Sequence, residues 1–290
     1  MFIFLAVISM LSYSLQAVLM AQYARSMDAL SCAIYRNISL VFSMLPLLLL
    51  VPPEEFSSLS NFYSEFILAG ILGGIALSCA YYAMNFFPVG IVTAVSSSIR
   101  VAMLLVLGFI FFAEEVAPIK ILFLSSILCT SLILAFQNYR MPHLKEDTKT
   151  GFLFVLIAGV LGSAWFLTIT HISREINPFM TGYFLEMTVG MGTILIGFLR
   201  FLFTGIKVQK ISRKDFQKIS LFALPTVLGT SCFALATRLG PIGLLSGIGT
   251  GSMISSSFMS YLIFRERLEP KHWLGISVVS LAILGIAYVD

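Results

Sequence analysis

The chain has 290 residues, of which 58% are hydrophobic and only 11% charged, and its formal net charge is +4. A soluble domain carries about 25% charged residues, so this composition excludes a water-soluble globule and predicts an integral membrane protein. The four cysteines show no metal-ligand spacing, and the small net charge does not indicate a nucleic-acid partner.

Several long apolar segments are each able to cross a bilayer as a helix, which takes about 20 residues. In chain order the ten segments are residues 2–24, 30–51, 62–86, 88–112, 117–136, 151–171, 178–203, 216–237, 241–264 and 271–288. The runs are continuous rather than alternating, and open strands would leave backbone groups unsatisfied in lipid, so we expect helices and not strands. We expect the first segment to be a permanent span, because it has no basic start and no cleavage site.

The two halves of the chain carry a weak internal repeat. Pro88-Val89-Gly90 corresponds to Pro241-Ile242-Gly243, before the fourth and the ninth segment. An acidic residue before the last segment of each half, Glu114 or Glu115, corresponds to Glu266. Membrane segments resemble one another by composition alone, but these matched positions favour a true repeat.

An odd number of spans in each half gives the repeat a physical meaning. Because five is odd, the second unit enters the membrane from the opposite side, and inverted repeats of this kind are common in secondary transporters. We expect one five-helix unit at residues 1–138, a polar linker at 139–150 and a second unit at 151–290.

Lysine and arginine predict the orientation, because they gather in cytoplasmic loops. Thirteen of the 18 lie in loops that follow odd-numbered segments, and three lie on the opposite side. We therefore expect both termini outside. Tyr81 and Tyr82 end the third segment, where tyrosine is expected at the membrane interface.

The repeated set of motifs resembles the EamA-like family of the drug/metabolite transporter superfamily. The resemblance is carried by FFPVGIVTAVSS through FFAEEVAPIKI, by LGPIGLLSGIG through FRERLEPKHWLG, and by SYSLQAVLMAQYARSMDALSCAIYRN. It implies an all-α membrane protein of ten transmembrane helices, arranged as two inverted five-helix repeats around a central cavity. It also implies transport of small metabolites, and not enzyme activity, in a bacterial cytoplasmic (inner) membrane, without a metal or other cofactor.

Arg100 is the main candidate for binding a solute. It lies near the middle of the fourth segment, where an arginine in hydrocarbon costs about 2.5 kcal/mol or several times more. Thr93, Ser97 and Arg100 share one helical face, and Ser96 lies beside them. We expect the guanidinium to bind an anionic group such as a carboxylate through its planar set of donors. The alternative is an ion pair or carbonyl contacts within the chain.

Other small and aromatic residues are candidates for the walls of the same site. Trp165 lies in the sixth segment, and Ser252 and Ser256 lie in the ninth, which we expect to face the serines of the fourth. The alternative for all three is ordinary helix packing, since small residues also allow helices to approach closely.

Glu186 is the only carboxylate well inside a segment. It has two candidate partners, Arg36 and Arg100, and pairing within the chain is the favoured interpretation. The alternative is that it binds and releases a proton during transport. We expect Glu186 and Arg36 to act in coupling or gating.

The leading hypothesis is a secondary carrier that moves a small polar metabolite, an amino acid or another carboxylate-bearing solute, by alternating access. Its partners would be this solute, the lipid bilayer and a coupling ion or counter-solute. The alternatives are a receptor or assembly protein without transport and, less favoured, an intramembrane enzyme, because the segments lack a catalytic set of acids, bases or metal ligands. Substrate identity, direction of transport and oligomeric state stay open at this point.

Overall fold

The computed structural model describes residues 1–112, 118–135, 144, 146–240, 245, 248–249, 251–266 and 268–289, and every regular element among them is helical. The α-helices are α1 (Phe2–Ser26), α2 (Ala29–Met44), α3 (Tyr63–Ala83), α4 (Val89–Phe112), α5 (Pro118–Ala135), α6 (Thr148–Glu175), α7 (Pro178–Thr204), α8 (Arg213–Leu239), α10 (Gly251–Phe264) and α11 (Pro270–Val289). Two 3-10 segments, η1 (Leu45–Leu50) and η2 (Pro53–Phe62), connect α2 to α3. The expected all-helical class is confirmed for the described residues.

Six helical segments in the described part of the chain are long and apolar enough to cross a membrane. They are Phe2–Ser26, Ala29–Leu50, Pro53–Ala83, Thr148–Glu175, Pro178–Thr204 and Arg213–Leu239. Many of their large apolar side chains are exposed, including Phe42, Ile67 and Phe203. Such a surface is unfavourable in water and suits contact with lipid.

The helices lie within a few residues of the expected segments, with two exceptions. In the ninth segment, expected over residues 241–264, the described helix is Gly251–Phe264. The second segment was predicted as one helix over residues 30–51. The α-helix ends at Met44 and continues as η1. Pro46 explains the change, because proline has no N–H for an α-helical hydrogen bond and its ring clashes with the preceding turn. Glu114, Glu115, Pro241-Ile242-Gly243 and half of the expected linker (residues 139–143 and 145) lie outside the described residues.

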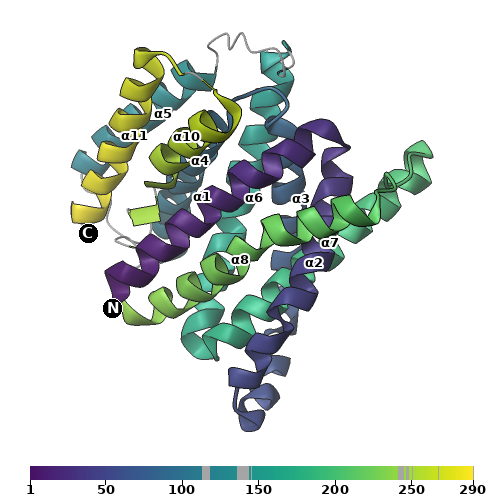
Figure 1. The fold of residues 1–290 in the computed structure, drawn as a ribbon. Helices are drawn as coiled ribbons and strands as arrows, with labels where there is room; N and C mark the ends of the chain where they lie inside the picture. Colours follow the sequence, from purple (N-terminus) through teal and green to yellow (C-terminus); the bar gives the residue numbers. More distant parts are fainter. Residues whose placement is uncertain are drawn as a thin grey trace.

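Helices from the two halves of the chain pack against each other. α1 packs on α8 and α10, α3 packs on α6 and α7, and α5 packs on α11. Figure 1 shows α1 and α8 running side by side, with α4, α5, α10 and α11 gathered on one side of them. Residues far apart in sequence therefore meet along the helix pairs.

Glycines set the close approach of α3 to α7. A Cβ at Gly70 would lie 2.5 Å from the carbonyl oxygen of Thr188, and one at Gly74 would lie 2.9 Å from the backbone nitrogen of Thr193. The two glycines are one helical turn apart on the same face. Small residues at this spacing allow two membrane helices to pack backbone to backbone.

The end of the bundle near the C-terminus of α1 is closed by a buried ion pair. Arg25 Nη1 lies 2.6 Å from Glu266 Oε1, and Arg25 also donates from Nε to the carbonyl oxygen of Met84 at 2.7 Å. Glu266 accepts hydrogen bonds from the backbone N–H of Val89, at 3.3 Å, and from the Ser260 hydroxyl. One carboxylate therefore connects α1, the start of α4 and the end of α10.

A second ion pair lies at the same end. The two oxygens of Asp28 each lie 2.8 Å from a nitrogen of Arg200, and Tyr82 donates to Asp28 at 2.9 Å. Asp28 is also the N-cap of α2, where it accepts from the backbone N–H of Ser31. Burial raises the pKa of Asp28, but the hydrogen bonds from Arg200, Ser31 and Tyr82 outweigh it and hold the pKa well below its usual range.

Candidate functional site

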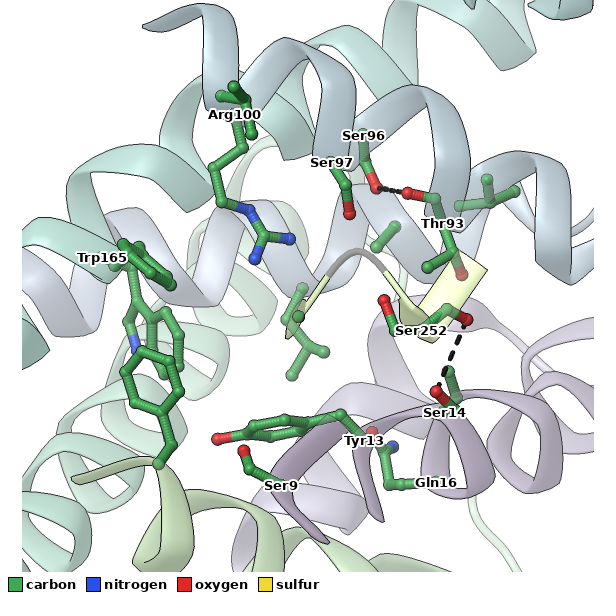
Figure 2. Close-up of a pocket in the computed structure, with 18 of the residues that line it drawn as sticks. Ser9, Tyr13, Ser14, Gln16, Thr93, Ser96, Ser97, Arg100, Trp165 and Ser252 are labelled. Atoms are coloured by element: carbon green, nitrogen blue, oxygen red, sulfur yellow. Dashed lines mark hydrogen bonds between the residues drawn. The ribbon is translucent and has the colours of Figure 1, made fainter. Parts of the chain in front are cut away.

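A cavity of about 280 Å³ lies between helices of both halves of the chain (Figure 2). It has the concave, mainly apolar character of a small-molecule site with a few polar groups. Its polar lining comprises Ser9, Tyr13, Ser14, Gln16, Tyr81, Thr93, Ser96, Ser97, Arg100 and Ser252. The apolar lining includes Trp165, Phe166, Phe233 and Leu245.

The four residues expected on α4 all line this cavity. Thr93 and Ser96 use their hydroxyls to donate to backbone carbonyls of their own helix, at Val89 and Thr93. Ser97 also lines the cavity but has no hydrogen-bond partner among the described residues. Its hydroxyl, one turn from Arg100 on the same face, is therefore available to a ligand.

Arg100 makes no hydrogen bond and no ion pair with the residues that the structure describes, and its Nε is buried without a partner. Its guanidinium carbon lies 6.0 Å from the centre of the Phe166 ring, which is a cation–π contact. Figure 2 shows the guanidinium leaving α4 and pointing into the cavity, toward Tyr13 and Ser9 on α1. The alternative was an ion pair or carbonyl contacts within the chain, and neither is found for Arg100 among the residues that the structure describes.

Of the three expected wall residues, two line the cavity. Trp165 comes from α6 and Ser252 from α10. Ser256 does not line it, because its side chain is fully buried and donates to the carbonyl oxygen of Met253 at 3.3 Å. Five residues beyond Ser252, α10 packs closely on α4. A Cβ at Gly90 on α4 would overlap the side chain of Ser257 on α10.

Sequence reasoning missed the contribution of α1, although its signal was present. Ser9, Tyr13 and Gln16 follow the spacing i, i+4 and i+7, which places them on one helical face, and all three line the cavity. Gln16 donates from Nε2 to the hydroxyl of Tyr81 at 2.8 Å. Tyr81 is only 2% exposed, so its side chain faces the protein interior at the end of α3.

A second cavity, of about 200 Å³, adjoins the first. The two cavities share Tyr13, Gln16, Ser96, Arg100 and Trp165 among their lining residues. The second cavity extends to Arg36 on α2 and Glu186 on α7. Arg100 therefore lies where the two cavities meet.

Arg36 and Glu186 form a buried ion pair at the far side of the second cavity, with Arg36 Nη1 2.8 Å from Glu186 Oε2. Arg36 also donates to Thr226 at 3.2 Å, and the other oxygen of Glu186 accepts from Thr230 at 3.1 Å. The hydroxyls of Thr230 and Tyr13 are 2.8 Å apart. A continuous set of hydrogen bonds thus joins the ion pair to the cavity wall.

Comparison with known proteins gives a family for both halves of the chain. A family model described as the EamA-like transporter family matches residues 1–136 and 149–288. No curated protein matches the sequence. A solved structure described only as the crystal structure of a protein is similar in fold, with a TM-score of 0.56 and 11% sequence identity, over 97% of this chain and 95% of the other.

Proposed function

Because this chain belongs to the EamA-like transporter family, we propose that it is a secondary carrier for a small carboxylate-bearing solute. Family membership and the apolar helices make it an integral multi-pass membrane protein, and members of the family are transporters rather than enzymes. The proposal adds the class of solute, the binding residues and the mechanism.

The observation that carries the proposal is the free guanidinium of Arg100. An arginine at membrane depth is unfavourable unless an anion, a polar group or water compensates it. The described residues offer Arg100 only the ring of Phe166, so a bound carboxylate would supply the missing anion. The free hydroxyl of Ser97 would donate to the same group, while Trp165 and Ser252 would hold the rest of the solute.

The helix packing supports two inverted units, at residues 1–138 and 151–290 with a linker at 139–150. Under this assignment α1 corresponds to α6, α3 to α8 and α4 to α10. The contact of α1 with α8 then has its counterpart in α6 with α3, and that of α1 with α10 in α6 with α4. The family model also matches the two halves separately. Two related units around one cavity are a suitable architecture for alternating access.

The two ion pairs near the C-terminus of α1 close that end of the helix bundle. They support a conformation in which the cavity opens toward the opposite end. The cavity lining on α1 extends from Ala6 to Ala17, whereas Arg25 and Asp28 lie beyond it in their ion pairs. Loops at this end carry most of the lysine and arginine, so we assign it to the cytoplasm and both termini to the outside. Opening toward the cytoplasm would then require the pairs Arg25–Glu266 and Asp28–Arg200 to separate.

The network around Arg36 and Glu186 suits a coupling or gating role. Tyr13 lines both cavities and contacts Thr230, which donates to Glu186. A solute that moves Tyr13 would therefore disturb the ion pair between α2 and α7. This connection links occupancy of the cavity to helices that the solute does not touch.

The test is transport by the purified protein in lipid vesicles. Vesicles preloaded with an unlabelled organic acid should take up the labelled acid, and the variant Arg100→Ala should abolish this exchange while the protein still folds. The variant Arg213→Ala is a matched control, because Arg213 is exposed at the first turn of α8. Normal exchange by Arg100→Ala would contradict the binding role, and no exchange of any organic acid by the unchanged protein would contradict the proposed function.

A further inference from the structure

The two joined cavities carry a single uncompensated charge. Among the described residues that line them, the acidic and basic side chains are Arg36, Arg100 and Glu186. Arg36 and Glu186 neutralise each other at 2.8 Å. The lining therefore has a formal charge of +1, and that charge is the guanidinium of Arg100.

Glu186 is not free to receive a cationic group of a ligand. One of its oxygens accepts from Arg36 and the other from Thr230, and the residue is only 3% exposed. An ammonium group could bind it only by competing with Arg36, which would leave a buried guanidinium without its ion-pair partner. Removing one partner from a buried pair is strongly unfavourable.

Arg36 is equally unavailable to a second anionic group. Its Nη1 donates to Glu186 and Asn37 and its Nη2 to Thr226, so only the buried Nε has no partner, and the side chain is only 5% exposed. A ligand with two negative charges would therefore find one free cation and not two. The second charge would be desolvated without compensation.

The walls beside Arg100 suit an apolar body. Trp165, Phe166 and Phe233 line the same cavity, and the rings of Phe166 and Phe233 are in edge-to-face contact with their centres 5.1 Å apart. Figure 2 shows Trp165 beside Arg100, on the opposite side of the guanidinium from Ser97. A flat aromatic or branched apolar group bound here would contact these rings while its anionic end reached Arg100.

From this arrangement we infer that the solute is an organic monocarboxylate with an apolar body and without an ammonium group. The inference rests on the proposed function and decides between its two solute classes, because a zwitterionic amino acid would bring a cation for which the described lining has no free anion. Binding of one monoanion makes the lining and its ligand electrically neutral together. That is the state in which a charged cavity is least unfavourable in a membrane.

The test uses four probes that share one phenyl ring and differ in charge. They are phenylacetate (one negative charge), phenylacetamide (neutral), phenylalanine (zwitterion) and phenylsuccinate (two negative charges). Binding to the full-length protein in detergent is measured by the shift in melting temperature with probe concentration. We expect phenylacetate to bind at least about tenfold more tightly than each of the others. Phenylacetamide has no charged partner for Arg100, and the other two probes bring a second charge that would be desolvated without compensation.

Two variants assign this preference to its residue. Arg100→Gln should bind phenylacetate and phenylacetamide equally, Arg100→Lys should keep a weaker preference for phenylacetate, and Arg213→Gln should behave as the unchanged protein. Phenylalanine or phenylsuccinate binding as tightly as phenylacetate would overturn the inference, as would the absence of binding by phenylacetate. Exchange of phenylalanine across the vesicle membrane would still support the carrier function. Binding of phenylacetate without its exchange would contradict the carrier function but not the inference about the ligand.

Discussion

Two arginines line the joined cavities of this protein, and their surroundings are opposite. Arg36 on α2 is 4% exposed, pairs with Glu186 at 2.8 Å and donates to Thr226. Arg100 on α4 makes no hydrogen bond or ion pair with the described residues through any of its three nitrogens and has only a ring contact with Phe166. The same side chain is therefore compensated by the chain in one place and left for another molecule in the other.

The difference shows how to distinguish charged residues that stabilise a membrane protein from charged residues that bind a ligand. A charge whose partner belongs to the chain stabilises one packing of the helices, provided that both partners are present. A charge that faces a cavity and has no partner in the chain adds nothing to the packing of the helices, so it indicates a ligand. The variants below test the two arginines against each other.

The largest effect is expected when Glu186 loses its charge. Glu186→Gln leaves the guanidinium of Arg36 buried without an ion-pair partner, and we expect it to lower the free energy of unfolding by about 3–5 kcal/mol. Unfolding in detergent measures this change. The double variant Arg36→Met with Glu186→Leu should recover most of the loss, because apolar side chains replace the whole pair. A Glu186→Gln protein as stable as the unchanged one would show that the pair does not hold the helices.

Replacement of Arg100 should leave the stability of the protein without solute almost unchanged. Arg100→Gln removes no hydrogen bond or ion pair to the described residues, so we expect the free energy of unfolding to change by less than about 1 kcal/mol. Arg36→Gln, measured in the same detergent, serves as the comparison and should lose several times more. Equal losses in the two variants would mean that Arg100 is structural.

A modest loss of stability is expected at Tyr13, which lies between the two arginines. Tyr13→Phe removes the hydrogen bond to Thr230, and a typical hydrogen bond contributes about 0.5–1.5 kcal/mol to stability. Tyr288→Phe is the control, because Tyr288 is 92% exposed. If Tyr13→Phe leaves both the melting temperature and the exchange rate unchanged, the connection between the cavity and Glu186 has no functional weight.

A pH-dependent effect is expected at Asp28, which lies between the first two spans and pairs with a third arginine, Arg200. The pKa of Asp28 in the folded protein lies below its unfolded value of about 3.9, so the stabilisation is complete above that value and is lost as the pH falls through the folded pKa. The difference in melting temperature between the unchanged protein and Asp28→Asn should stay constant from pH 7 to pH 5 and narrow below about pH 4. Asparagine keeps the N-cap of α2, so the variant removes the ion pair and the hydrogen bond from Tyr82 but not the cap. A difference that shrinks between pH 7 and pH 5 would contradict this assignment.

The sequence by itself determined the class of protein and much of one wall of the cavity. Long apolar runs can satisfy their backbone groups in lipid only as helices, and α4 carries its polar residues with helical spacing. Thr93, Ser97 and Arg100 therefore had to share a face, and that face lines the cavity. A single helix has no freedom to place them otherwise.

Only the tertiary structure decided which residues meet across helices. Glu186 lies 150 positions from Arg36, and the sequence offered it Arg100 as an equal partner. Ser252 and Ser256 looked alike in sequence, yet one lines the cavity and the other is packed against the chain. The physical reason is that helical periodicity fixes only which residues share a face. The rotation, depth and close approach of each helix depend on packing at points such as Gly70, and these decide what each face meets.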